Sequence, residues 1–250
     1  MATGAPDYFK RILLYGMYNG QAVPLACDEQ GRVIFIAEKV SPYDKSGTIL
    51  VEETFESGLV HVRTETQGDG AAVTIEAGEA AFGGHSCKLT GGKDGQRYAR
   101  ILIPFPVGTA SKLGLDWHMR LDDYIEMIEI NLQLRTTSWT RSGTLRYEKA
   151  NTRWVLYDDI TGEMVTIASG QDYADDQNYF YRFKLIINPV TQRYERFRYG
   201  PHEVDLSDYG LTEYSEAGYD QGYLYILAKS ESGQNGFALI DNIIITQDES

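Results

Sequence analysis

Residues 125–135, Ile125-Glu-Met-Ile-Glu-Ile-Asn-Leu-Gln-Leu-Arg135, decide the fold of this chain. From position 128 onward, apolar and polar residues alternate strictly. The apolar positions are Ile128, Ile130, Leu132 and Leu134, and the polar positions are Glu129, Asn131, Gln133 and Arg135. Successive side chains of a β-strand point to opposite faces, so this period of two predicts a strand with one dry face and one polar face.

More strands are expected on both sides of this one. Fourteen short apolar or alternating runs, separated by turn residues, lie between residues 49 and 246, and helical signals are weak. The 250 residues include 18 tyrosines and 25 glycines, which favours β structure with many turns. Fourteen strands are too many for an immunoglobulin-like domain. We therefore predict an all-β fold, a two-sheet antiparallel jelly-roll sandwich over residues 48–250.

An N-terminal β-hairpin arm is predicted over residues 1–38, followed by a linker over residues 39–47. Asn19-Gly20 between two apolar runs is a strong hairpin signal, because a type I′ turn needs positive φ at both central positions. A second turn is expected at residues 28–31. Two hairpins of this size cannot bury their own apolar faces, so the arm needs a surface on the main domain or on another chain. The arm residues expected to make this contact are Leu13, Leu14, Tyr15, Val23, Leu25, Val33 and Phe35.

The charge balance narrows the function classes. The formal net charge is −13 and no Lys/Arg cluster interrupts it, which argues against nucleic acid as a partner. No apolar run is long enough to span a bilayer, and the first residues lack a basic segment followed by an apolar one, so no membrane association is expected. Cys27 and Cys87 are expected as buried free thiols, with a disulfide as the alternative.

The first and last strand-like segments of the main domain resemble segments of a known class of domain. Residues 52–58, Glu-Glu-Thr-Phe-Glu-Ser-Gly, and residues 237–246, Phe-Ala-Leu-Ile-Asp-Asn-Ile-Ile-Ile-Thr, resemble the first and last strands of carbohydrate-binding modules and concanavalin-like jelly rolls. In those domains a structural calcium ion joins such positions, so the resemblance implies a calcium site at Glu56 and Asp241. Asp241 lies in an otherwise apolar strand and needs a partner. The alternative is that Asp241 caps a turn or accepts backbone hydrogen bonds.

The arm carries a second resemblance. Residues 14–25, Leu-Tyr-Gly-Met-Tyr-Asn-Gly-Gln-Ala-Val-Pro-Leu, followed by Asp28-Glu-Gln-Gly-Arg-Val33, resemble a segment of tailed-phage virion proteins. An arm followed by a jelly roll is similar to capsid decoration, or cement, proteins. The resemblance implies a capsid or other virion protein as partner, a homotrimer, and a location in the virus particle after assembly in the host cytoplasm.

Two aromatic groups are candidate binding surfaces. Trp117, Trp139 and Trp154 are candidates for a platform on which a sugar stacks, with the polar face of residues 129–135 supplying hydrogen bonds. The alternatives are that these tryptophans fill the core or an interchain seam. On residues 194–200, Tyr194, Arg196 and Arg198 share one strand face and are candidates for a protein interface, because Tyr and Arg are enriched at such contacts.

Catalytic signals are absent from the sequence. Glu126 and Glu129 resemble the carboxylate pair of a glycosidase, but residues three apart on a strand point to opposite faces. No nucleophile elbow is present. We therefore expect a non-enzymatic structural protein of a virus particle, a capsid decoration protein without a cofactor. The alternative is a carbohydrate-binding jelly-roll module, free or carried on a virion.

Overall fold

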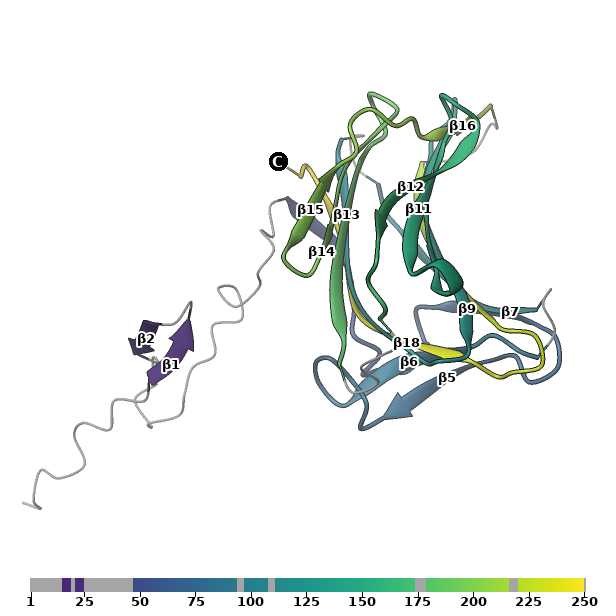
Figure 1. Ribbon diagram of the computed structural model, residues 1–250. Coiled ribbons are helices and arrows are strands. Elements are labelled where there is room, and N and C mark those ends of the chain that lie inside the picture. Colours follow the sequence, from purple (N-terminus) through teal and green to yellow (C-terminus); the bar gives the residue numbers. More distant parts are fainter. Residues whose placement is uncertain are drawn as a thin grey trace, which may run out of the picture. The chain divides into compact units, whose positions relative to one another are not determined.

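The computed structural model describes residues 47–93, 97–107, 111–173, 179–215 and 220–249, together with the backbone of two short strands near the N-terminus. The chain divides into two compact units, Met1–Lys45 and Ser46–Ser250. The larger unit is a sandwich of two sheets (Figure 1). Cys87 lies inside it as a free, buried thiol, and Cys27 lies outside the described residues.

The smaller unit contains the predicted first hairpin. Strands β1 (Tyr15–Tyr18) and β2 (Gln21–Pro24) pair antiparallel, with Tyr18 opposite Gln21. Asn19 and Gly20, where the sequence predicts the turn, lie outside the described residues. The predicted second turn and the expected contact residues Leu13, Leu14, Leu25, Val33 and Phe35 lie outside the described residues.

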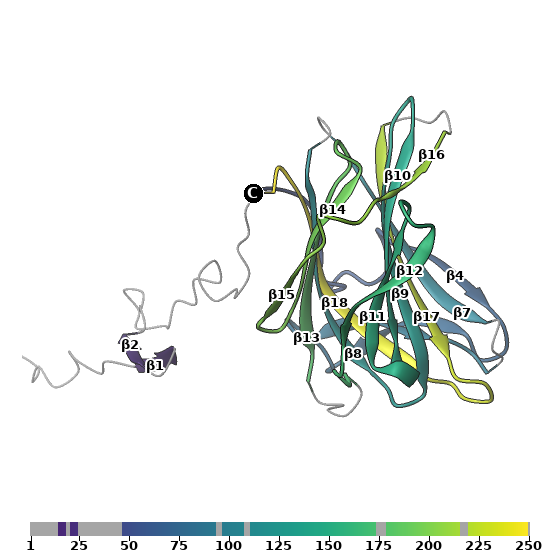
Figure 2. The same cartoon turned by 45° about the horizontal axis from the view of Figure 1, so that its top comes forward.

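The first sheet of the sandwich, here sheet I, has the strand order β12-β11-β10-β9-β17-β7-β4, and β16 pairs with β10. Its strands are β4 (Arg63–Gln67), β7 (Tyr98–Phe105), β9 (Ile125–Arg135), β10 (Thr140–Glu148), β11 (Arg153–Asp158), β12 (Glu163–Ser169), β16 (Thr212–Tyr214) and β17 (Gln221–Ser230). A single turn of 3₁₀-helix, Lys149–Asn151, joins β10 to β11. Strand β17 comes from near the chain's end and lies between β7 and β9 (Figure 2).

The second sheet, here sheet II, has the order β15-β14-β13-β8-β18-β6-β5, and β3 pairs with β18. Its strands are β3 (Thr48–Glu53), β5 (Ala72–Ala77), β6 (His85–Thr90), β8 (Leu113–Leu121), β13 (Tyr181–Asn188), β14 (Arg193–Tyr199), β15 (His202–Asp205) and β18 (Phe237–Gln247). All strand pairings in both sheets are antiparallel, and the described part of the chain contains no α-helix. The predicted all-β, two-sheet jelly-roll sandwich is confirmed.

The core fills the space between the two sheets. On β9, the four apolar positions that alternate in the sequence are fully buried, as predicted. An aromatic cluster continues the core between β8, β11, β13 and β14. In it the ring centroids of Trp117 and Phe183 lie 5.3 Å apart, and those of Trp154 and Phe197 lie 5.0 Å apart. Within the residues described, no helix is long and apolar enough to cross a membrane.

Candidate functional site

Around β8, the outer face of sheet II is covered by other parts of the chain. On β8 the outward residues Asp116, His118 and Arg120 are each less than a tenth exposed. The loop between β5 and β6 contacts His118 and Arg120, while Asp116 pairs with Arg182 on β13. The loop's Phe82 ring packs edge-on against His118, with centroids 5.1 Å apart, and its Glu79 pairs with Arg120. Groups that are already desolvated and paired offer few free hydrogen-bonding positions to a ligand.

The C-terminal residues cover the same face beside β13. Lys184 Nζ donates to Glu249 Oε1 at 2.9 Å, and the two side chains are only 4% and 0% exposed. Gly114 on β8 makes room for this pair, since a Cβ there would lie 2.4 Å from Glu249 Oε1. The ion pair is therefore part of the packed structure.

Asp241 on β18 holds the loop between β5 and β6 in place. Its Oδ2 accepts the backbone N–H groups of Ala81 at 2.8 Å and Phe82 at 2.9 Å, and its Oδ1 accepts the N–H of Asn242 at 2.7 Å. Burial raises the pKa of Asp241 in spite of these bonds, and the nearby Glu56 carboxylate raises it further. Asp241 thus accepts backbone hydrogen bonds, which is the alternative that the sequence left open.

Glu56 holds the next residues of that loop. Its Oε1 accepts the N–H groups of Gly84 at 2.7 Å and His85 at 2.9 Å, and its Oε2 lies 3.0 Å from His85 Nδ1. All four oxygens of Glu56 and Asp241 therefore face nitrogen atoms, whereas calcium takes six to eight oxygen ligands. No group of three or more His, Cys, Asp or Glu residues in the described ranges is arranged to hold a metal. Both carboxylates of the expected calcium site thus accept N–H hydrogen bonds, and calcium binding at Glu56 and Asp241 stays a prediction.

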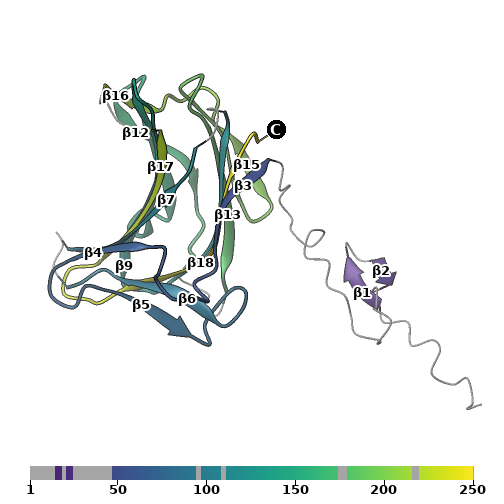
Figure 3. The same cartoon turned by 180° about the vertical axis from the view of Figure 1, so that it is seen from behind.

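The outer face of sheet I carries partly exposed polar and aromatic side chains instead. Figure 3 shows β7 and β17 bowed, with their concave side turned away from sheet II. The strand register aligns two outward rows across β7, β17 and β9. One row is Arg100, Leu227 and Glu129, and the other is Leu102, Tyr225 and Asn131. Segments far apart in the sequence thus form one continuous surface.

A shallow hollow of about 340 Å³ lies on this surface. Its lining residues are Arg100, Glu129, Asn131, Tyr225 and Leu227. All five are partly exposed, so their polar groups are in contact with water rather than locked in the core. The hollow combines an aliphatic side chain, an aromatic ring, an amide and two charged groups within one small area.

Arg100 lies near two aromatic rings. Its guanidinium carbon is 5.6 Å from the centroid of the Tyr98 ring and 5.5 Å from that of Tyr225. The guanidinium also pairs with Glu65 on the neighbouring strand β4. The Tyr98 hydroxyl and then Arg100 donate to Glu65, and they hold the pKa of that carboxyl below its ordinary value. These contacts restrict the orientation of the Arg100 side chain on the face.

The other polar groups of the hollow are also oriented by their neighbours. Arg146 donates from Nε and Nη2 to Glu129 Oε2, at 3.1 and 2.7 Å. Asn131 Nδ2 donates to Thr144 Oγ1 at 2.7 Å, which fixes the orientation of its amide. Within the described ranges the Asn131 carbonyl oxygen has no hydrogen-bond donor, so it is available to a ligand hydroxyl.

The tryptophan platform expected from the sequence is wrong for two of its three members. Trp117 and Trp154 are 0% and 1% exposed and belong to the core. On β8, Trp117 has the same parity as the buried Leu115 and Met119, and this parity places it between the sheets. Trp139 is only partly buried, and its ring lies against the Arg141 guanidinium at 4.3 Å.

The expected interface face of residues 194–198 is wrong for Tyr194, which is fully buried. The pairing of β13 with β14 is irregular here: Ile186 faces Arg196, whereas Ile187 faces Tyr194. The extra residue between them reverses the alternation, so Tyr194 points into the core and Arg196 remains on the outer side. Arg198 also remains on the outer side and pairs with Glu203 on β15.

The two glutamates considered for catalysis have separate cationic partners. Glu126 accepts from Lys229 Nζ at 2.8 Å, and Glu129 accepts from Arg146. Each carboxylate is thus held by its own ion pair on β17 or β10, which is an ordinary arrangement on a polar sheet face.

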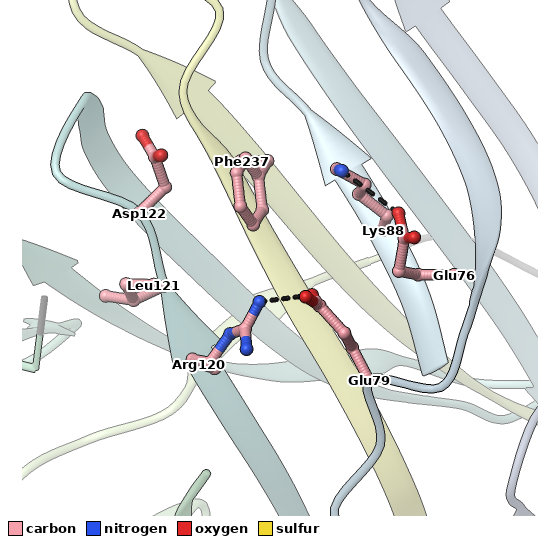
Figure 4. A pocket seen from close by; sticks show the side chains of 7 residues that line it. All are labelled: Glu76, Glu79, Lys88, Arg120, Leu121, Asp122 and Phe237. Atoms are coloured by element: carbon pink, nitrogen blue, oxygen red, sulfur yellow. Dashed lines mark hydrogen bonds and ion pairs between the residues drawn. The ribbon is translucent and has the colours of Figure 1, made fainter. Parts of the chain in front are cut away.

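A second hollow lies on sheet II, where β8 ends and β18 begins (Figure 4). Figure 4 shows Lys88 directed at Glu76 on one side of the Phe237 ring and Arg120 directed at Glu79 below that ring. Lys88 Nζ also lies 4.3 Å from the centroid of that ring. Because Arg120 is buried and Lys88 lies over the only aromatic ring that lines it, this hollow is a weaker candidate than the one on sheet I.

Comparisons with known proteins bear on the fold. No family model matches the chain, and no curated protein matches it. The chain resembles the structure of a carbohydrate esterase from the Shiga toxin-encoding bacteriophage phi24B, with a TM-score of 0.50 and 10% identity over 81% of this chain and 100% of that one. It also resembles Cip1, a cellulose-induced protein, with a TM-score of 0.46 and 13% identity over 78% and 96% of the two chains. A xylan-binding domain from Paenibacillus barcinonensis has a TM-score of 0.39 and 14% identity, over 83% and 99%. The similar structures thus include a phage protein and carbohydrate-binding domains, and at these identities the likeness is one of fold.

Sequence reasoning found only part of this site. It placed Glu129 and Asn131 on a polar strand face, which the structure shows. It missed Arg100, Tyr225 and Leu227, because residues 223–228 are apolar or aromatic at every position and give no alternation from which to choose a face. The available signal was Arg100, the only charged residue in the otherwise apolar and aromatic run of residues 98–105.

Proposed function

We propose that this chain is a non-catalytic carbohydrate-binding protein that holds its glycan in the hollow on the outer face of sheet I. The observation that carries the proposal is the composition of that hollow. A sugar presents a C–H face that packs on an aromatic ring and hydroxyl groups that need both donors and acceptors. Tyr225 and Leu227 supply the apolar contact, while Asn131, Glu129 and Arg100 supply the hydrogen-bonding groups.

The likeness to a phage carbohydrate esterase agrees with this proposal but does not carry it, because it concerns the fold. The absence of catalysis is part of the proposal. It is tested by incubating the protein with acetylated xylan and other polysaccharides and measuring released acetate and reducing ends. Release above that of a heat-inactivated sample would overturn the non-catalytic part of the proposal.

Glycan binding is tested by affinity electrophoresis in gels that contain neutral or acidic polysaccharides, followed by calorimetry on the best ligand. We expect Tyr225→Ala and Asn131→Ala to weaken binding about tenfold each, since a lost hydrogen bond or ring contact in a binding site costs about 1–1.5 kcal/mol. Tyr124→Ala is the matched control, because Tyr124 is a half-exposed tyrosine outside the hollow. Failure to bind any glycan, or equal binding by the wild type and Tyr225→Ala, would overturn the proposal.

A second proposed function is attachment to a virus particle through the N-terminal unit. Its support is the division of the chain into two compact units, the smaller of which contains the β1–β2 hairpin. In this proposal the partner is a capsid or other virion protein and the chain forms a homotrimer. Light scattering on the full chain and on residues 46–250 tests it: we expect a trimer for the first and a monomer for the second. A monomeric full chain that does not sediment with purified phage particles would contradict it.

A further inference from the structure

The charge of the outer face of sheet I is opposite to that of the whole chain. The chain has 36 Asp and Glu residues against 23 Lys and Arg residues. On this face, however, six cations project from β4, β7, β9, β10, β11 and β17. They are Arg63, Arg100, Arg135, Arg146, Arg153 and Lys229. A local excess of cations in a strongly acidic protein favours an anionic ligand.

Four of these cations have a carboxylate partner on the same face. Their pairs are Arg100 with Glu65, Arg146 with Glu129, Arg153 with Glu148, and Lys229 with Glu126. Arg63 and Arg135 have no carboxylate partner in the part of the chain that the structure describes. Arg135 bonds Gln133 at 3.2 Å instead, and its guanidinium lies 5.1 Å from the centroid of the Tyr223 ring. The face thus has two cations in excess, on either side of the hollow.

The arginine in the hollow is oriented for an anion. The Arg100 guanidinium carbon lies 5.6 Å from the centroid of the Tyr98 ring and 5.5 Å from that of Tyr225, which is within the range of a cation–π contact. A guanidinium has five N–H donors, and the contact with Glu65 leaves further donors unused. Oxyanions, whether planar carboxylates or tetrahedral groups such as phosphate, are the ligands that such a fork recognises.

We propose that the glycan bound on sheet I is anionic, with its carboxylate or sulfate groups on Arg100, Arg135 and Arg63. This inference rests on the proposed carbohydrate-binding function and names the ligand class of the same hollow. Tyr225 and Leu227 pack against the sugar ring, and Arg100 contacts its charged group. Arg63 and Arg135 lie on either side of the hollow and take the charges of neighbouring sugar units in a polymer.

The experiment compares polygalacturonate, chondroitin sulfate, and neutral xylan and galactan by affinity electrophoresis and calorimetry, at low and at moderate salt. We expect an anionic polymer to bind at least tenfold more tightly than the neutral polymers, and its affinity to fall as salt rises. Arg100→Gln should weaken binding at least tenfold and Arg135→Gln about threefold or more. Arg135→Gln is the more specific test of the proposal, because this substitution leaves no carboxylate without its cationic partner.

Arg198→Gln is the control, because it makes the same change of charge on sheet II. Thermal melts of each variant confirm that the fold is retained. Tight binding of polygalacturonate identifies carboxylates as the ligand, and tight binding of chondroitin sulfate alone identifies sulfates. Binding of neutral polymers that equals that of anionic ones and survives Arg100→Gln would overturn this inference and leave the proposed function standing. Equal loss in Arg198→Gln would show unspecific charge attraction and overturn it, and no binding to any polymer would overturn both proposals.

Discussion

Replacing Tyr194 by phenylalanine should destabilise the sandwich, because the hydroxyl of this residue joins the two sheets. The ladder between β10 and β11 begins at Leu145 opposite Leu156 and runs toward the 3₁₀ turn. One residue beyond it, the Tyr194 hydroxyl accepts the backbone N–H of Thr144 at 2.8 Å. It also lies 3.2 Å from the Thr144 carbonyl and 3.0 Å from that of Tyr157, to which it donates. The Tyr194 hydroxyl therefore takes the place of the next main-chain hydrogen bond between β10 and β11.

The size of the effect follows from what Tyr194→Phe leaves behind. Tyr194 is fully buried, and Gly143 makes room for its ring, since a Cβ there would lie 3.0 Å from Tyr194 Cε1. Water cannot easily take the place of the lost hydroxyl in so tight a site, so the Thr144 N–H and one carbonyl lose their partner. A buried backbone group without a partner costs about 1–3 kcal/mol. We expect a loss of about 2 kcal/mol in the free energy of unfolding.

The assay is urea and thermal unfolding of the wild type and two variants, followed by far-UV circular dichroism. For a domain of this size, about 2 kcal/mol corresponds to a fall of roughly 4–8 °C in Tm. Tyr199→Phe is the control: it lies on the same strand, and its hydroxyl has no hydrogen-bond partner among the described residues. If Tyr194→Phe unfolds within about 0.5 kcal/mol of the wild type, or if Tyr199→Phe loses as much, the assigned role of the hydroxyl is wrong.

Three further predictions concern stability and reactivity. Gly222→Ala should cost more than about 2 kcal/mol in urea unfolding, because its Cβ would lie 2.0 Å from the buried ring of Phe105; a smaller loss would mean that the ring moves aside. Burial raises the pKa of Asp158, but hydrogen bonds from Gly210, Thr161 and Ile160 outweigh this effect and lower the pKa. The Asp158 carboxylate therefore stabilises the fold above about pH 4, and this contribution is lost as the pH falls through the lowered pKa. Asp158→Asn should therefore lose about 1–3 kcal/mol at pH 7 and less at pH 3, and an equal loss at both would contradict the assignment. Burial raises the pKa of the Cys87 thiol to about 12, so in a Cys27→Ser variant an aromatic disulfide reagent at pH 8 should label no thiol until guanidinium is added, and fast labelling of the native protein would contradict this.

The sequence predicted the layers of the fold because alternation is a local signal. Strand β9 alternates since one of its faces lies in the core and the other in water. Strand β8 is buried at all nine positions, because a loop and the C-terminal residues cover its outer side. Burial by segments that are distant in the sequence leaves no local pattern from which it could be predicted. The site was harder to predict from the sequence for the same reason. Arg100 and Glu129 come together only because β17 pairs with both β7 and β9, and this register depends on the whole sheet. A single extra residue in β14 reverses the alternation, and for this reason the sequence prediction placed Tyr194 on the outer face although it lies in the core.

The position of the site follows from the different environments of the two outer faces. On sheet II, Asp241 and Lys184 are buried and already bonded to the loop and to Glu249, so a ligand would have to break those bonds without regaining any solvation. On sheet I, Asn131 and Arg100 are partly exposed, and they can exchange bound water for the hydroxyl or acid groups of a ligand at little net cost. The neighbouring rings and ion pairs have already fixed their orientation, which lowers the entropy lost on binding. A hydrophilic ligand is therefore favoured on sheet I, and β17 is the strand whose insertion between β7 and β9 creates its binding surface.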